Sequence, residues 1–256
     1  MPSYPLTALV LRKTKLGESD LIVALLAEDG SHVRAVAKGA RKPGSKLAAR
    51  VEPYVSLDLL VHTGKSLEII QEARTVKARA AIRSDFDKGA AASVVVDLLN
   101  TIAVEVQAEP RLFSLADTTL DAIDRAPAET LPRLVTGFVL KAMAMHGYRP
   151  ELTQCTGCGG EAQGSVSFSL SAGGILCGAC AGSDPAALQV PAEAVRWLDV
   201  LMRSTMAEIA DLEMPTRAVV DCFDVVRAFV AYHLPARLRA LDFYAGQVRE
   251  LSTNGG

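Results

Sequence analysis

Four of the five cysteines of this chain fall into two close pairs. Two residues separate Cys155 from Cys158, two separate Cys177 from Cys180, and 18 residues lie between the pairs. Each pair presents two thiolates from one tight turn, and two such turns together supply four soft ligands in the tetrahedral arrangement that suits Zn²⁺. We therefore predict one structural Zn²⁺ ion held by Cys155, Cys158, Cys177 and Cys180.

Other cysteine chemistries fit this pattern less well. A redox pair usually stands alone at the start of a helix in a βαβ unit. A zinc deaminase requires an upstream H-x-E and a P-C-x-x-C motif, but His146-Gly147-Tyr148 lacks the glutamate and Thr153-Gln154 precede the first cysteine. Four thiolates also fill the position that a catalytic zinc keeps open. An iron–sulfur cluster and a redox couple remain the alternatives, and Cys222 is expected to be a small core residue.

The chain is expected to be cytoplasmic. Its first apolar run, Leu6–Leu11, is followed by Arg12 and Lys13 rather than by a small-residue cleavage site. The most apolar stretch, residues 90–106, contains two carboxylates and an asparagine, whereas a membrane span needs about 18 or more apolar residues. In a reducing compartment the five cysteines should not form disulfides.

The first 80 residues have the pattern of short strands. Runs rich in Val, Leu and Ile, several of them alternating with polar residues, are separated by turn signals such as Asp29-Gly30, where Gly adopts a positive φ without steric cost. Five short strands in about 75 residues suit a small barrel, and the OB-fold is the candidate. The predicted strands are Leu6–Lys15, Leu21–Ala27, Val33–Lys38, Val51–Val61 and Leu67–Ala73.

From Ser84 onward the apolar residues recur with helical spacing. Ser84 followed by Asp87 predicts a helix start and Pro110 its end. Further helices are predicted to open at Ser114, at Thr130, at Pro191 and at Pro215, and one continuous apolar face is expected from Val195 to Ile209. Residues 150–186 interrupt this rhythm with glycines and the cysteine quartet.

These patterns predict an α+β protein, in which an N-terminal five-stranded OB-fold barrel is followed by an α-helical domain with a Cys₄ zinc-finger insert. The expected boundaries are 1–80 for the barrel, which binds nucleic acid, 81–150 for the first helical part, 151–186 for the insert, 187–251 for the second helical part and 252–256 for a disordered tail.

The formal net charge of −2 hides an asymmetry between the two ends of the chain. Residues 1–83 carry 14 Lys and Arg against 8 Asp and Glu, and the remainder carries 13 against 21. Such asymmetry indicates a nucleic-acid contact confined to one part, although a solvated loop is the simpler alternative. Only two aromatic residues, Tyr4 and Tyr54, lie in the basic part, so we expect binding through phosphates. The candidate DNA-binding residues are Arg12, Lys13, Lys15, Arg34, Lys38, Arg41, Lys42, Lys46 and Arg50.

No catalytic constellation is evident. Gly64-Lys65-Ser66 resembles the end of a phosphate-binding P-loop, but Leu59 stands where its first glycine should be. The four histidines have neither metal-ligand nor triad spacing, and there is no G-x-S-x-G nucleophile elbow. We predict that the protein is not an enzyme.

Several segments resemble the bacterial RecO family of recombination mediators over nearly the whole chain. They are the strand Leu9-Val10-Leu11 with Gly17-Glu18-Ser19-Asp20, the segment from Val36 to Lys42, and the cysteine quartet after a helix that ends at Gly147-Tyr148.

This resemblance implies a mediator of DNA repair that is associated with the nucleoid. It would bind single- and double-stranded DNA, anneal complementary strands and assist RecA loading onto strands coated by single-strand-binding protein (SSB), with RecR as the protein partner. Two other classes stay open: a zinc-ribbon transcription or translation accessory factor whose barrel docks proteins, and a metal-dependent hydrolase.

Overall fold

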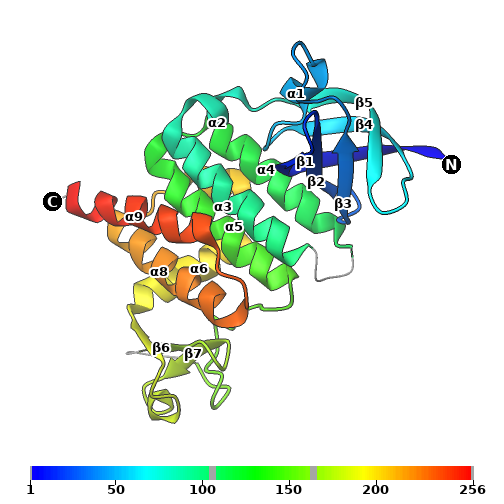
Figure 1. The fold of residues 1–256 in the computed structure, drawn as a ribbon. Coiled ribbons are helices and arrows are strands. Elements are labelled where there is room, and N and C mark those ends of the chain that lie inside the picture. The colour runs from blue at the N-terminus through cyan, green and yellow to red at the C-terminus, as the bar shows by residue number, and fades with distance from the viewer. Residues whose placement is uncertain (1, 104–107, 162–165, 255–256) are drawn as a thin grey trace. The chain divides into compact units, whose positions relative to one another are not determined.

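The computed structural model describes residues 2–103, 108–161 and 166–254, and the chain divides into two compact units, residues 1–125 and 126–256. The first unit begins with a closed barrel (Figure 1), and the second is mainly helical.

The barrel has the strand order β1-β2-β3-β5-β4, which closes on itself because β4 also pairs with β1. All neighbours are antiparallel except β3 and β5. Side chains on alternate positions fill its interior, among them Val10, Val23 and Ala35, each fully buried. The five strands are β1 (Ser3–Leu16), β2 (Asp20–Ala27), β3 (His32–Ala37), β4 (Ser56–His62) and β5 (Glu68–Lys77).

The predicted strands are confirmed in number and order, with one correction. The run Val51–Val61 is not strand throughout, since β4 begins only at Ser56. The preceding residues follow the short helix α1 (Lys46–Arg50), and Tyr54 has a φ of 73°, which interrupts extended backbone. The predicted hairpin at Asp29-Gly30 is confirmed, because Gly30 has a φ of 85° between β2 and β3.

Three helices complete the first unit: α2 (Ala80–Ser84), α3 (Phe86–Ile102) and α4 (Pro110–Arg125). Ser84 does not cap α3 as predicted, because it belongs to α2 and its hydroxyl donates back to the carbonyls of that helix. Asp85 is the N-cap and accepts from the Lys88 amide. The second helix opens at Pro110 rather than at Ser114, since a proline at the first helical position loses no hydrogen bond. Residues 104–107 lie outside the described part.

In the second unit, α5 packs against α6, α7 and α8, and α9 packs against α8. Helix α5 begins after Thr130, as predicted. The helices predicted at Pro191 and Pro215 begin one residue later. The face expected from Val195 to Ile209 is split between two helices, because α6 ends at Arg203 and Thr205 forms a capping box that starts α7. The helices are α5 (Leu131–Met145), α6 (Ala192–Arg203), α7 (Met206–Asp211), α8 (Thr216–His233) and α9 (Arg239–Asn254), with a 3₁₀ turn at Ala128–Thr130.

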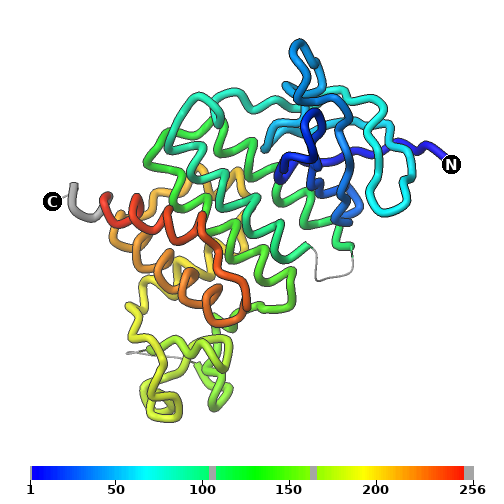
Figure 2. The backbone as a smooth tube through the Cα atoms, viewed as in Figure 1, coloured from blue at the N-terminus to red at the C-terminus, as the bar shows by residue number. Residues whose placement is uncertain are grey.

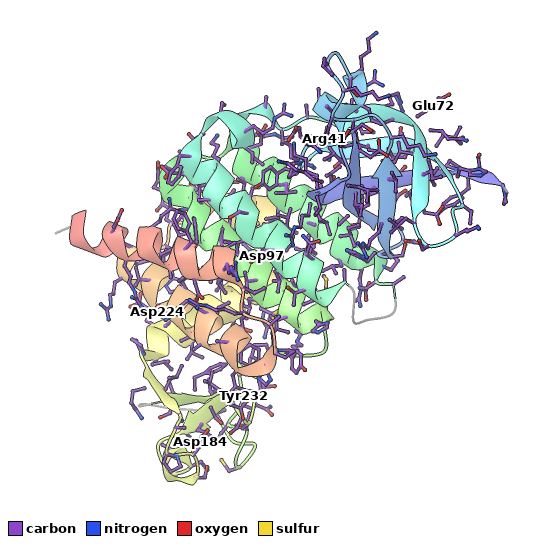
Figure 3. The ribbon with its side chains drawn as sticks, viewed as in Figure 1. Arg41, Glu72, Asp97, Asp184, Asp224 and Tyr232 are labelled. Atoms are coloured by element: carbon purple, nitrogen blue, oxygen red, sulfur yellow. The ribbon has the colours of Figure 1, made fainter. Side chains whose placement is uncertain are left out.

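The segment between α5 and α6 leaves the helices, forms a small sheet and returns (Figure 2). Strand β6 (Val166–Ser169) lies between β7 (Gly174–Cys177) and β8 (Leu188–Val190). A 3₁₀ turn at Ala181–Ser183 leads to Asp184 (labelled in Figure 3), whose carboxylate accepts a 2.6 Å hydrogen bond from the Ser169 hydroxyl.

The predicted fold class is thus confirmed as an N-terminal OB-fold barrel followed by helices with a Cys₄ insert. Among the described residues, no helix combines the length and the apolar character that crossing a membrane requires.

Candidate functional site

The four predicted cysteine ligands come together in the insert. Their sulfur atoms all lie within 4.8 Å of one another, and the Sγ atoms of Cys158 and Cys177 are 3.9 Å apart. Cys155 is buried, Cys158 is exposed, and the other two are half-buried. Among the described residues this is the one group of three or more His, Cys, Asp or Glu side chains with metal-binding proximity.

Two backbone turns bring the sulfurs together. In the first, the Gly159 amide donates to the Cys155 carbonyl at 2.8 Å, and in the second the Cys180 amide donates to the Cys177 carbonyl at 2.9 Å. The first turn is held against β7 by the Thr156 amide, which donates to Ile175. Gly157 lies where the first turn approaches the second closely. A Cβ atom at this position would lie 3.2 Å from the Cys180 Sγ and 3.1 Å from the Cys180 Cβ.

The pKa values of two thiols of the quartet are shifted in opposite directions. The Cys177 amide donates to the Cys155 Sγ at 3.3 Å, and this bond lowers the pKa of Cys155 to about 6. Hydrogen bonding to the neighbouring cysteine sulfurs, first that of Cys177, raises the pKa of Cys180 to about 12. Crowded thiols resist ionising together, whereas a bound cation favours the thiolate form of all of them. The donor set therefore fits a thiophilic divalent metal.

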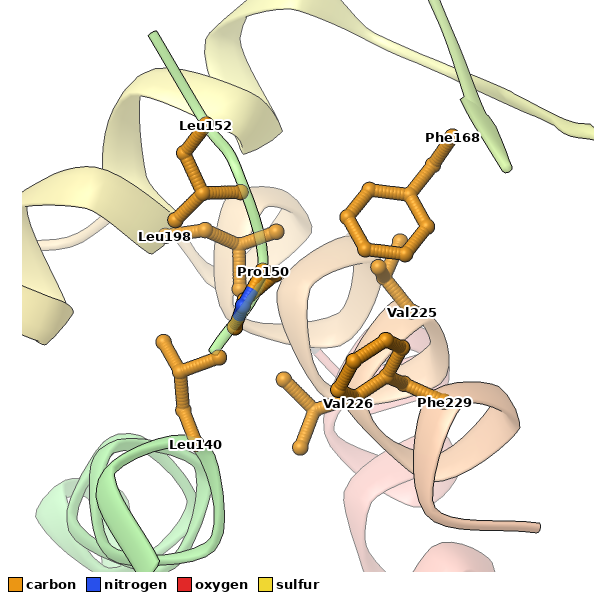
Figure 4. Close-up of a pocket in the computed structure, with 8 residues that line it drawn as sticks. All are labelled: Leu140, Pro150, Leu152, Phe168, Leu198, Val225, Val226 and Phe229. Carbon is orange, nitrogen blue, oxygen red and sulfur yellow. The ribbon is translucent and has the colours of Figure 1, made fainter. Parts of the chain in front are cut away.

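The insert is joined to the helices by an apolar contact. The ring of Phe168, on β6, meets that of Phe229, on α8, edge to face with centroids 5.8 Å apart. Around them lies an apolar pocket (Figure 4) lined by Leu140, Pro150, Leu152, Phe168, Leu198, Val225, Val226 and Phe229. The folding of the cysteine turns is thus linked through one strand to the core of the second unit.

The nine candidate DNA-binding residues all lie on the barrel or on its loops, but they do not share one face. Arg12 on β1 and Arg34 on β3 both pair with Ala24 of β2, so their side chains stand on the same outer face. Lys13 and Lys15 alternate with Arg12 and oppose the interior residues Val23 and Leu21. They therefore point to the end of the barrel, which α1 covers through Leu47.

The loop after β3 carries Lys38, Arg41 and Lys42, and hydrogen bonds hold it against the β1–β2 turn. Arg41 (labelled in Figure 3) donates from its backbone amide to the Ser19 carbonyl and from its guanidinium to the Gly17 carbonyl, both at 2.8 Å. The carboxylate of Asp20 accepts from the Gly39 amide, and this bond contributes most to lowering the pKa of Asp20.

Three of the nine cations already have partners in the protein. Lys13 pairs with Glu52, Arg41 binds the Gly17 carbonyl, and Arg50 donates to the Ala73 carbonyl at 2.8 Å. The sequence held no signal for these contacts, because each joins segments more than 20 residues apart. Six exposed cations make no hydrogen bond or ion pair with the described residues: Arg12, Lys15, Arg34, Lys38, Lys42 and Lys46.

The two aromatic residues of the barrel are both half-buried. Burial raises the pKa of Tyr54, and it also raises that of Tyr4, which contacts Glu68. Each ring is therefore only partly accessible to a nucleic-acid base.

Two family models match this chain. One, described as "Recombination protein O N terminal", matches residues 1–79, and the other, "Recombination protein O C terminal", matches residues 83–242. Among curated relatives, the DNA repair protein RecO of Desulforamulus reducens is 30% identical over 95% of this chain and 94% of the relative. The protein of the same name from Frankia casuarinae is 34% identical, over 95% of this chain and 98% of the relative. That of Bifidobacterium adolescentis is 31% identical, over 94% and 98%.

Proposed function

Because this chain belongs to the RecO family of DNA repair and recombination proteins, we propose that it is a non-enzymatic recombination mediator. It binds single- and double-stranded DNA through its barrel and anneals complementary strands. Together with RecR it assists RecA loading onto DNA coated by SSB. It acts on chromosomal DNA in the cytoplasm.

The observation that carries this proposal is the set of six exposed cations that form no hydrogen bond or ion pair with the described residues. Arg12 and Arg34 lie on the outer face of the barrel, and Lys38 directly follows β3. Lys15 lies near the end of β1, Lys42 in the loop after β3 and Lys46 at the start of α1. Lys and Arg side chains that lack protein partners are available for phosphates, and phosphate contacts hold DNA without reading its sequence. A mediator needs this property because it must act on any broken chromosome sequence.

Annealing follows from the same charges. Two DNA strands repel each other through their phosphates, and cations that neutralise part of this charge lower the barrier to their encounter. Base pairing then supplies the free energy. Gly64-Lys65-Ser66 does not form a P-loop, because it joins two antiparallel strands, β4 and β5, instead of linking a strand to a helix.

We further propose that the cysteine quartet holds Zn²⁺. Cys155, Cys158, Cys177 and Cys180 would fill its coordination sphere, which favours a structural role over a catalytic one. Bound there, the ion supplies a cross-link between the two turns. Phe168 of the insert packs against Phe229 of α8, so this cross-link would also stabilise the contact between the insert and the helices.

An annealing assay tests the mediator function. Two complementary labelled strands, bare or coated with SSB, are mixed with and without the protein in buffer that contains no nucleotide. The protein should accelerate duplex formation for any complementary sequence, and raising the salt concentration should slow it. Tight DNA binding without acceleration on either kind of strand would contradict the mediator function and favour an accessory factor with a docking barrel.

A further inference from the structure

The four sulfurs of the quartet differ in how far solvent can reach them. Cys158, in the first turn, is exposed, whereas Cys155 is buried and both Cys177 and Cys180 are half-buried. A small oxidant dissolved in the surrounding water therefore meets the Cys158 sulfur first. Exposure and thiolate character together decide which cysteine an oxidant modifies, and a bound cation keeps the sulfurs in the thiolate form.

A second sulfur lies close to Cys158 on the other turn. The Sγ atoms of Cys158 and Cys177 are 3.9 Å apart, and because bonded sulfurs lie about 2 Å apart, the pair must approach by about 2 Å to form a disulfide. Cys177 is the last residue of β7 and is fixed by pairing with Val166 of β6. Cys158 precedes Gly159, where an added Cβ would meet no atom of the described residues within 4 Å. The first turn therefore has room to carry Cys158 toward Cys177.

The other two sulfurs are less suited to react. The Cys155 Sγ accepts from the Cys177 amide at 3.3 Å, and the amides of Gly157 and Cys158 also help to lower its pKa to about 6. These bonds hold the sulfur in place, and a thiolate of low pKa is a weaker nucleophile. Cys180 packs against Gly157, where a Cβ would lie 3.2 Å from the Cys180 Sγ. Exposure and freedom to move thus favour the pair that crosses between the turns.

We propose that Cys158 and Cys177 are a site of reversible oxidation by hydrogen peroxide, which links the two turns through a disulfide and expels the metal ion. This inference goes beyond the mediator function. Its metal-release step rests on the zinc site proposed above, whereas formation of the disulfide does not.

The two sulfurs supply the two electrons that reduce the peroxide. The Cys158 thiolate attacks one peroxide oxygen, so that an S–O bond forms, the O–O bond breaks and hydroxide leaves. The Cys177 thiolate then attacks the Cys158 sulfur, so that the S–S bond forms and the S–O bond of the sulfenic acid breaks to release a second hydroxide. Both hydroxides take up protons from solvent and become water.

The disulfide removes two of the four ligands. The two remaining thiolates do not complete the tetrahedral coordination that a structural zinc ion requires, so the ion leaves. The disulfide joins the same two turns that the metal had joined, and the sheet of the insert keeps its support. In a reducing compartment, cellular thiols would reduce the link again, because disulfides there are transient.

The test treats the whole, zinc-loaded chain with hydrogen peroxide. Released zinc is measured with a colorimetric indicator, free thiols are alkylated, and the protein is cut after glutamate without reduction. Cleavage after Glu151, Glu161 and Glu193 places the first cysteine pair on the peptide 152–161 and the second on the peptide 162–193. A disulfide between the turns joins these two peptides, whereas a disulfide within one pair leaves them separate. Fragmentation spectra identify the two linked cysteines.

We expect a link between Cys158 and Cys177 and the release of about one zinc ion for each linked chain. Dithiothreitol should restore the thiols, and added zinc should then bind again. Amides of β6 and β7 should stay protected in the linked protein. Cys158→Ser should form no link. Cys222→Ser, at a buried position of α8 outside the quartet, is the matched control and should behave like the wild type.

Several results with the wild-type protein would overturn the inference, and none of them requires a variant to fold. They are a disulfide within either C-x-x-C pair, a link through Cys155 or Cys180, irreversible oxidation of Cys158 without a link, and full retention of the thiols in excess peroxide. A wild-type chain that forms the link but carries no zinc when purified would support the disulfide and contradict the proposed zinc site.

Discussion

The buried guanidinium of Arg79 and the half-buried carboxylate of Asp117 form an ion pair that joins the end of the barrel to helix α4. The Arg79 side chain is 2% exposed, and its nitrogens make five hydrogen bonds, to the side chains of Asp117, Asp121 and Ser56 and to the carbonyls of Tyr54 and Asp117. Its backbone is left-handed, with a φ of 44°. One side chain thus satisfies polar groups from two separate segments, residues 54–56 and helix α4.

Replacing this arginine by lysine should destabilise the first unit. An ammonium group has three donors and cannot reproduce the planar fork, so Arg79→Lys leaves buried acceptors and carboxylates poorly paired. We expect a loss of about 3 kcal/mol, the lower range for breaking a buried pair. Amide hydrogen exchange in β4 and β5 measures it. Arg83→Lys, at an exposed position of α2, is the control and should change exchange little.

The same cluster makes the first unit sensitive to acid. Burial alone would raise the pKa of Asp117, but hydrogen bonds from Lys77, Ser56 and Arg79 outweigh it and lower the pKa. Stability from this carboxylate is therefore fully present above its unfolded pKa of about 3.9 and is lost as pH falls through the lower folded value. Asp117→Asn should be less stable at neutral pH and should lose less stability on acidification below about pH 4. Equal acid sensitivity in both proteins would contradict this assignment.

Removing one cysteine of the quartet should release the metal and loosen the insert. Cys180→Ser replaces a thiolate by a poor zinc ligand, and the free energy of structural zinc binding is also free energy of folding. Elemental analysis should find one zinc per wild-type chain and little in the variant, and amides of β6 and β7 should exchange faster. Cys222→Ser, buried in α8 away from the quartet, should keep its zinc. Metal-free wild-type protein with a protected insert would rule out the site.

Two of the glycines beside the quartet, Gly157 and Gly160, should differ in their tolerance of a methyl group. A Cβ at Gly157 would lie 3.2 Å from the Cys180 Sγ, whereas one at Gly160 would be 3.6 Å from the Cys158 Sγ, an ordinary contact. Gly157→Ala should weaken zinc binding by about tenfold or more, the effect of disturbing residues that orient ligands. Gly160→Ala should bind zinc nearly as well as the wild type. Competition with a chelator measures both, and equal affinities would show that the turns adjust freely.

Neutralising the loop cations should reduce the salt dependence of DNA binding. If six cations each contact one phosphate of a single strand, log K should fall against log salt with a slope of about −4, and the triple variant Lys38→Gln/Lys42→Gln/Lys46→Gln should lower its magnitude by about 2. Arg41 is left intact because it supports the loop through Gly17. Lys65→Gln, in the connection between β4 and β5, is the control. An unchanged slope in the triple variant would identify the loop as a solvated surface.

Local sequence patterns were sufficient to locate the five strands of the barrel and the cysteine quartet. Alternation of apolar residues located β1 to β5 because a strand repeats its environment every two residues, and the paired C-x-x-C turns identified the quartet because each turn sets two ligands locally. The same reasoning failed where a tertiary contact overrides a local signal. Residues 51–55 look like strand but turn at Tyr54, whose carbonyl accepts from Arg79.

Which face each cation occupies was decided only by the closed barrel. By itself the sequence determined that Arg12, Lys13 and Arg34 lie in a basic region, but not that Arg12 and Arg34 share an outer face across Ala24 while Lys13 pairs with Glu52 at the barrel end. Strand register and the bulge between Val10 and Arg12 determine this placement. They depend on pairings between distant segments, and a shift of one residue would reverse every side chain. The periodicity of a chain is local information, but the partner of each charge exists only once the barrel has closed.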